Sequence, residues 1–76
     1  MTRPPQVSGE RVIRALQRFG FVEVRRTGSH AILRHATEPA RRATVPLHGG
    51  KDVRPGTLRA ILEGAGVSIE DLKDVL

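Results

Sequence analysis

Apolar residues after residue 8 recur at the spacing of a helix face. Four of them share one side of a helix with 3.6 residues per turn: Val12, Ile13, Leu16 and Phe19. Ser8 can cap the N-terminus of this helix with its hydroxyl group, and Gly20 can adopt the left-handed conformation that ends many helices. The pattern predicts a first helix from Ser8 to Gly20. Because Pro4-Pro5 disfavours a helix start, residues 1–7 are predicted to form a flexible leader.

Alternation of apolar and polar residues replaces the helical spacing after Gly20. In the segment 21–26, Val22 and Val24 alternate with charged residues, which predicts a half-buried strand with the valines facing inward. Thr27-Gly28 is a turn signal. The pattern that follows predicts a return strand over residues 29–35, a loop over 36–41 and a third strand over 42–47. Pro46 cannot donate a ladder hydrogen bond, so we expect it near a strand end or at a sheet edge.

Helical spacing returns near the C-terminus. Pro55 is typical of a first helical turn, and four residues form an apolar stripe behind it: Leu58, Ile61, Leu62 and Ala65. Ser68 is predicted to cap a short last helix that points three residues inward: Ile69, Leu72 and Leu76. The order of elements predicts an α+β fold of the α-β-β-β-α type with a short C-terminal helix. We expect a single domain over residues 8–76, with helices on one face of a three-stranded antiparallel sheet.

The composition limits the classes to which the protein can belong. With 76 residues and no cysteine, the chain has neither a disulfide framework nor a cysteine nucleophile. No apolar run approaches the roughly 18 residues that a membrane-spanning helix needs, and the N-terminus does not read as a signal peptide. A cytoplasmic protein with no membrane partner is therefore expected.

The charge is unevenly distributed along the chain. Residues 1–61 hold 12 Lys or Arg against four acidic residues, whereas residues 62–76 hold one Lys against four acidic residues. A basic body predicts a polyanionic partner, and nucleic acid fits better than a membrane because no helix combines a bulky apolar face with a cationic rim. Charge alone is equally compatible with a solvated basic surface that binds nothing.

His30 is the first candidate for catalysis, in the run Gly28-Ser29-His30. A histidine at a strand end can present its imidazole at the surface, and an unperturbed imidazole exchanges protons near pH ~6.5. Gly28 allows a phosphate to approach the backbone closely. A partly exposed strand histidine without a function is the alternative interpretation.

The other histidines give weaker signals. His35 is interpreted as a solvated residue of the hairpin, and His48 lies either near a bound phosphate or simply in a loop. His30 and His35 are five residues apart, so on one strand they would face opposite sides of the sheet. With no cysteine and few acids nearby, no metal site and no metal cofactor are expected.

Other chemistries fit the sequence less well. No pair of carboxylates suggests glycoside chemistry, and Gly49-Gly50-Lys51 lacks the spacing of a phosphate-binding loop. The two aromatic residues, Phe19 and Phe21, both fall at core positions, which excludes a sheet that stacks RNA bases on surface aromatics. RNA binding would instead depend on phosphate charge, shape and 2′-hydroxyl contacts, as in double-stranded-RNA-binding modules.

From residue 8 to the C-terminus the chain resembles the HicA-type toxins of bacterial and archaeal toxin–antitoxin systems. The matching features are Leu16 with Phe19-Gly20-Phe21, Gly28-Ser29-His30, Val45-Pro46-Leu47-His48-Gly49 with Lys51, and Pro55-Gly56-Thr57-Leu58 with Ile61-Leu62 and Ala65-Gly66. The resemblance implies a double-stranded-RNA-binding-like fold, a metal-independent mRNA endonuclease and a HicB-type antitoxin that covers the active site. It also implies that His30 is the catalytic histidine.

A mechanism follows from the resemblance as a hypothesis. Metal-free RNA cleavage removes a proton from the 2′-hydroxyl group, which then attacks the adjacent phosphorus, and an imidazole suits this transfer. Cationic donors should stabilise the charge on the phosphate, and the nearest candidates are Lys51, Arg26 and Arg34. Ser29 is expected to orient the site or to bind a phosphate.

Two points stay open at the level of sequence. The second proton-transfer group is either His48 or water. The main alternative function is a non-catalytic double-stranded-RNA-binding module, and a third is a small protein whose basic face binds only an acidic protein partner.

Overall fold

A helix, a three-stranded sheet and two further helices follow one another in the computed structural model, which describes residues 3–76. The elements are α1 (Gly9–Gln17), β1 (Phe21–Arg26), β2 (His30–His35), β3 (Arg42–Pro46), α2 (Pro55–Ala65) and α3 (Ile69–Asp74). The strands are antiparallel in the order β1-β2-β3. This confirms the predicted α+β fold and its α-β-β-β-α arrangement with a short C-terminal helix.

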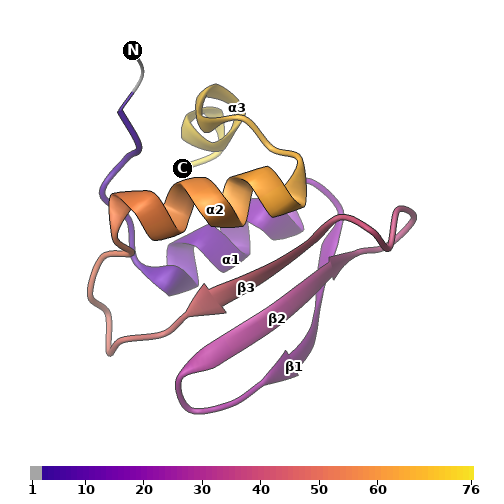
Figure 1. The fold of residues 1–76 in the computed structure, drawn as a ribbon, viewed down its shortest axis with the longest axis horizontal. Helices are drawn as coiled ribbons and strands as arrows, with labels where there is room; N and C mark the ends of the chain where they lie inside the picture. The colour runs from indigo at the N-terminus through magenta and orange to yellow at the C-terminus, as the bar shows by residue number, and fades with distance from the viewer. Residues whose placement is uncertain (1–2) are drawn as a thin grey trace.

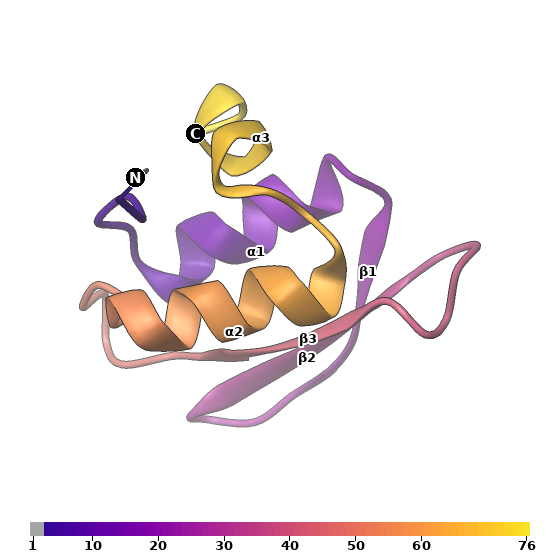
Figure 2. The same ribbon diagram turned by 45° about the horizontal axis from the view of Figure 1, so that its top comes forward.

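The molecule has two layers. Helices α1 and α2 lie over the same face of the sheet, with α2 along β3, and α3 lies on the far side of these helices from the strands (Figures 1 and 2). Leucines from four elements are fully buried between them: Leu16, Leu33, Leu58 and Leu72. Burying a leucine side chain contributes roughly 1.5–3 kcal/mol, so this core holds the helices against the sheet.

The predicted helix signals mostly act as expected. The Ser8 hydroxyl accepts the Arg11 N–H at 3.3 Å, and the Ser68 hydroxyl accepts the Asp71 N–H at 3.0 Å. Helix α1 ends at Gln17, before the predicted boundary at Gly20, because the backbone turns between these residues. After α3, Leu76 is exposed rather than inward, and the half-buried Val75 packs against the core instead.

The face that β1 turns toward the helices is the opposite of the one predicted. Val22 and Val24 are 51% and 54% exposed, whereas Phe21 is buried. Phe21 takes the inward position at the start of the strand, so its neighbour Val22 points outward. A register shift between Glu23 and Arg25 makes Val24 a bulge residue. Alternation predicts that a strand has two faces, but the packing of Phe21 decides which face is buried.

The segment before α1 takes part in the core. Val7 is 1% exposed, and its carbonyl oxygen accepts the Val53 N–H at 2.8 Å. Ser8 and Asp52 form an isolated antiparallel bridge beside this bond. Residues 1 and 2 of the predicted leader lie outside the described residues, and Val7 belongs to the packed domain. The N-terminal segment thereby fixes one end of the loop that joins β3 to α2.

Candidate active site

A pocket of about 720 Å³ opens where β2, the β3–α2 loop and the start of α2 meet. Three of the predicted site residues line it together: His30, His48 and Lys51. Further polar residues that line the pocket are Thr44, Asp52, Arg54 and Thr57. The pocket thus combines two imidazoles with two cationic side chains and one carboxylate. This is a combination that can exchange protons and bind an anion.

Strand pairing brings the two histidines to the same pocket. His30 is the partner of Pro46 across β2 and β3, and the Leu47 N–H continues this ladder by donating to the Ser29 carbonyl oxygen at 2.8 Å. His48 follows directly after Leu47, so it leaves the sheet beside the start of β2. The register of β2 and β3 therefore brings His30 and His48 to one pocket, although they are 18 positions apart in the sequence.

A tight turn places Lys51 next to His48. The Lys51 N–H donates to the His48 carbonyl oxygen at 3.1 Å, and the two residues between them have positive φ angles, +59° for Gly49 and +89° for Gly50. Residues with a side chain are strained at such angles, so the conformation of this turn favours glycine at both positions. The turn lets His48 and Lys51 line one pocket from the two ends of a four-residue segment.

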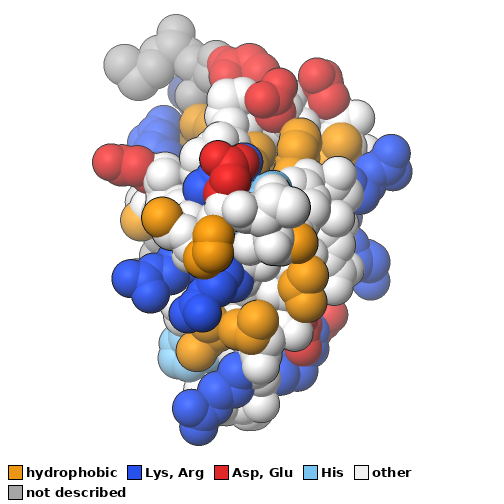
Figure 3. Space-filling view, turned by 90° about the vertical axis from the view of Figure 1, so that its right-hand side faces the viewer, with side chains coloured by type: hydrophobic (Ala, Val, Ile, Leu, Met, Phe, Trp, Pro, Cys, Tyr) orange, Lys and Arg blue, Asp and Glu red, His pale blue; other side chains and the backbone are white. Residues whose placement is uncertain are grey.

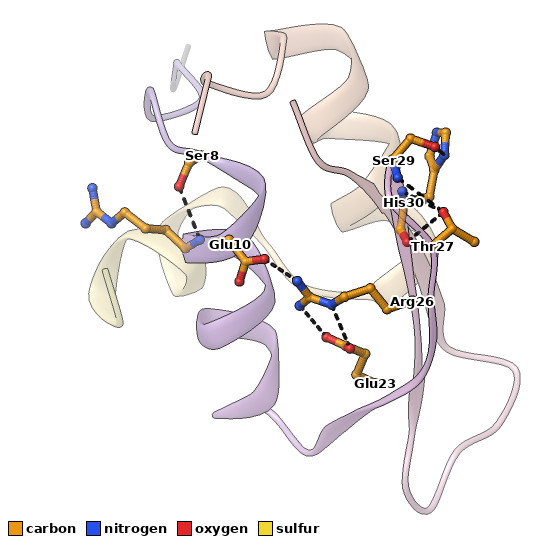
Figure 4. Close-up of polar contacts among 8 residues, drawn as sticks. Ser8, Glu10, Glu23, Arg26, Thr27, Ser29 and His30 are labelled. Atoms are coloured by element: carbon orange, nitrogen blue, oxygen red, sulfur yellow. Dashed lines mark hydrogen bonds and ion pairs between the residues drawn. The ribbon is translucent and has the colours of Figure 1, made fainter. Parts of the chain in front are cut away.

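The turn between β1 and β2 holds His30 in place (Figure 4). The Thr27 hydroxyl group accepts the N–H of Ser29 at 3.3 Å and that of His30 at 3.1 Å, and the Thr27 N–H donates to the His30 carbonyl oxygen at 2.8 Å. The Ser29 Oγ lies 3.0 Å from the His30 Nδ1. The Nδ1 of His30 thus has a hydrogen-bond partner in Ser29, while the Nε2 of this exposed ring remains available to another molecule. Thr27 is a positioning residue that the sequence identified only as part of a turn.

Gly28 has no internal reason to be glycine. Its φ angle is not positive, and a Cβ atom at this position would meet nothing within 4 Å. The space beside its backbone is open. The predicted close approach of a phosphate to Gly28 therefore stays a prediction, and the open space leaves room for it.

Arg26, one of the predicted cationic donors, faces away from the pocket. Figure 4 shows its side chain turned toward α1, where it contacts the carboxylate of Glu10, while two of its nitrogens donate to Glu23 at 2.9 and 2.6 Å. The hydrogen bond from Arg26 lowers the pKa of Glu23 below its usual value, and the two carboxylates raise the pKa of Arg26. Arg26 joins β1 to α1.

Arg34, another predicted donor, does not line the pocket either. It is exposed on β2, four residues from His30, and lies opposite Arg42 in the strand register.

Comparison with known proteins places this chain in a family. Residues 9–67 match the sequence profile of a family described as the HicA toxin of bacterial toxin–antitoxin systems. The chain belongs to the HicA toxin family. A comparison with curated proteins finds no match to the chain. Membership makes this protein a toxin whose partner is an antitoxin.

The matched segment of this HicA-family chain includes every residue of the pocket. It also includes Arg54 and Thr57, which sequence reasoning did not assign to the site. Arg54 immediately precedes α2 as its N-cap and makes no side-chain capping bond. The sequence predicts a helix start at Arg54-Pro55. The path of the β3–α2 loop, which the sequence does not predict, brings this start to the pocket that His30 lines.

The cations of the pocket are available for a ligand. Among residues 3–76, neither Lys51 nor Arg54 forms a side-chain hydrogen bond or an ion pair, in contrast to Arg26 and Arg41. The first bond of α2 runs from the Leu58 N–H to the Arg54 carbonyl oxygen, so the positive end of the helix faces the same region. Asp52 is the single carboxylate among the lining residues of the described chain and offsets part of this charge.

The HicA-family chain uses His35 for structure, which corrects its interpretation as a solvated residue. The half-buried ring lies edge-on to Phe21 at 5.2 Å between centroids. Its Nδ1 accepts the backbone N–H groups of Thr37 and Glu38 at 3.2 and 3.1 Å, which leaves the Nε2 to donate to the Phe19 carbonyl oxygen at 2.9 Å. His35 therefore links the end of α1 to the β2–β3 loop.

Charge differs between the two ends of the molecule. On the face drawn in Figure 3, acidic side chains gather at the end that carries α3, and Lys and Arg side chains lie over the body below.

Within the described residues 3–76, no group of three or more His, Cys, Asp or Glu residues is arranged to hold a metal ion. No helix in this part of the chain is long and apolar enough to cross a membrane.

Proposed function

We propose that this HicA-family toxin is a metal-independent endoribonuclease that cleaves mRNA in the cytoplasm, with His30 as its catalytic residue. The observation that carries the proposal is the pocket, where His30 lies beside two cations that have no partner among the described residues. A phosphodiester needs both a proton acceptor and positive charge. The side chains of this pocket can supply both without a metal ion.

In the proposed reaction, His30 acts as a general base toward the 2′-hydroxyl group of the RNA. The proposed tautomer carries its proton on the Nδ1, 3.0 Å from the Ser29 Oγ, which would leave the lone pair of the Nε2 free to accept the proton. The 2′-oxygen then attacks the adjacent phosphorus. Lys51 and Arg54 stabilise the additional charge on the phosphate oxygens, in the role that the sequence suggested for Arg26 and Arg34.

The antitoxin partner is proposed to be of the HicB type and to cover this pocket. A protein that inserts a carboxylate between Lys51 and Arg54 would exclude the RNA phosphate by occupying the same cations. The pocket is open on the surface, so such a partner can reach it without rearranging the fold.

The experiment is RNA cleavage by purified protein in EDTA, with His30→Ala as the decisive variant. The wild-type protein should cleave RNA in EDTA, and His30→Ala should lose about 100-fold or more in rate, the range typical of general acid–base groups. Because His30 is exposed, the variant should keep its circular dichroism spectrum and its melting temperature. Equal cleavage by both proteins would reject the role of His30. Salt-sensitive RNA binding with no cleavage by either would instead indicate the non-catalytic RNA-binding module.

A further inference from the structure

Cleavage by attack of the 2′-hydroxyl group needs a second proton transfer that His30 does not supply. As the new bond from the 2′-oxygen to phosphorus forms, the bond from phosphorus to the 5′-oxygen breaks. The 5′-oxygen leaves as an alkoxide unless an acid protonates it, and such general acid catalysis typically contributes about 10²–10⁴-fold. The acid must reach the side of the phosphate opposite the attacking oxygen, so it should come from another wall of the pocket.

We infer that His48 is this general acid, an inference that rests on the proposed function. His30 lines the pocket from the start of β2, and His48 lines it from the loop after β3. In the step, His30 takes the 2′-hydroxyl proton and protonated His48 gives its proton to the 5′-oxygen. The products are a 2′,3′-cyclic phosphate and a 5′-hydroxyl end.

The other lining residues of the described chain fit this role less well. An unperturbed carboxylic acid such as that of an aspartate has lost its proton at neutral pH, and unperturbed lysine and arginine side chains hold theirs too strongly to release it. An imidazole exchanges its proton in the range between them. Asp52, Lys51 and Arg54 are therefore better suited to set the charge around the phosphate than to protonate the leaving oxygen.

Backbone hydrogen bonds hold the chain around His48 in place, as a residue that transfers a proton requires. The Gly49-Gly50 turn closes on the His48 carbonyl oxygen, and the Leu47 N–H is bonded to Ser29, so the segments on both sides of His48 are fixed. The charged or titratable groups around it come from every neighbouring element: His30 from β2, Lys51, Asp52 and Arg54 from the loop, and Glu10 of α1 across a smaller adjacent pocket.

A substrate with a better leaving group tests the inference. In an oligoribonucleotide with sulfur in place of the bridging 5′-oxygen, at the bond that the wild-type protein cuts, the thiolate leaves without protonation. His48→Ala should lose about 10²–10⁴-fold on ordinary RNA and return to within about tenfold of wild type on the sulfur substrate. His30→Ala should stay impaired on both. On ordinary RNA, the wild-type rate should decline at alkaline pH as the general acid loses its proton, and His48→Ala should not show this decline.

The failure of this inference differs from the failure of the proposed function. Wild-type cleavage of ordinary RNA by His48→Ala, or an equal loss on both substrates, would overturn the inference and leave the role of His30 intact. Asp52→Asn gives the matched comparison in the same pocket. A rescue by sulfur in Asp52→Asn but not in His48→Ala would assign the acid to Asp52 and overturn the inference as well. Wild-type activity of His30→Ala would overturn the proposed function itself.

Discussion

Single side chains of one residue type have different roles in this molecule. Arg26 is held by two carboxylates and joins β1 to α1, whereas Arg54 has no partner among residues 3–76 and lines the pocket. His35 is bonded at both ring nitrogens, while the exposed His30 and His48 line the pocket. The hydrogen bonds around a side chain, rather than its type, separate the structural residues from those that line the pocket here.

The cations of the pocket should affect the chemical step more than other surface charges do. Lys51→Ala and Arg54→Ala should each lower the single-turnover rate constant for cleavage by about tenfold or more, because each removes positive charge from the proposed phosphate site. Arg59→Ala is the control, since Arg59 is exposed on α2 and does not line the pocket. The measurement is single-turnover RNA cleavage, and an equal loss in all three variants would indicate general electrostatic attraction only.

His35→Ala should destabilise the fold by about 2 kcal/mol. The change removes a part-buried hydrogen bond to the Phe19 carbonyl oxygen, which contributes about 1 kcal/mol, and the edge-on ring contact with Phe21, which contributes about as much. The exposed N–H groups of Thr37 and Glu38 can bind water in place of the Nδ1. Urea unfolding measures the effect. His48→Ala is the matched control, since it is exposed and should change the free energy of unfolding by less than about 0.5 kcal/mol. Similar values for the two variants would contradict the structural role of His35.

At the scale of elements, short segments bring the site together. The β1–β2 turn fixes His30, the Gly49-Gly50 turn fixes His48 and Lys51, and the start of α2 supplies Arg54. The link between Val7 and Val53 ties the β3–α2 loop to the segment before α1. The pocket is therefore built where these three segments meet, and each contributes at least one side chain that can exchange a proton or bind an anion.

The contact between α1 and β1 through Arg26 should make stability depend on acid pH. The pKa of Glu23 is lowered in the folded protein by its hydrogen bond to Arg26, so its stabilising effect is complete above the unfolded value, about 4.3. It is lost as the pH falls through the lower folded pKa. In thermal melts from pH 7 to pH 3, Glu23→Gln should therefore show a smaller decline of Tm than wild type.

Glu63→Gln is the control for this titration. Glu63 is exposed on α2 and forms no ion pair within the described residues. Its replacement should leave the acid-side decline of Tm as in wild type. A decline in Glu23→Gln as steep as that of wild type would mean that the ion pair with Arg26 contributes nothing measurable, as is common for exposed pairs.

At the scale of the whole molecule, the charge is divided between a basic body and the end that carries α3 (Figure 3). Most of the 13 Lys and Arg residues precede α2, and three of the eight acidic residues lie in α3. A polyanion would therefore approach the body of the molecule, where the pocket lies, and would be repelled by the α3 end. The charge distribution thus gives a polyanion, such as the proposed RNA substrate, a preferred direction of approach.

RNA binding should accordingly weaken steeply with salt. For single strands the slope of log K against log salt is about −0.7 per phosphate neutralised, so four contacts predict a loss of about 50-fold between 50 and 200 mM salt. Fluorescence anisotropy with His30→Ala and a labelled RNA measures binding without cleavage. Affinity that does not change with salt would argue against phosphate binding and in favour of a basic face that serves only a protein partner.

The sequence by itself determined the elements and their order, because these depend on local physics. The stripe from Leu58 to Ala65 is buried as its helical spacing predicts, Ser8 and Ser68 cap their helices, and Pro46 ends an edge strand. His30 and its Ser29 neighbour were also identifiable as candidates, since both belong to one short motif. These properties need only neighbours within a few positions along the chain.

Tertiary structure decided which side chains share a surface. Nothing in the sequence pattern distinguishes Arg26 from Arg54, yet one pairs with α1 and the other lines the pocket. The exposure of Val22 and Val24, which the alternation predicted to face inward, likewise depends on how β1 packs against the helices that cover the sheet. Strand register and the path of the β3–α2 loop bring His48 to His30 across 18 residues. Such contacts arise from packing between distant segments, which local spacing does not encode.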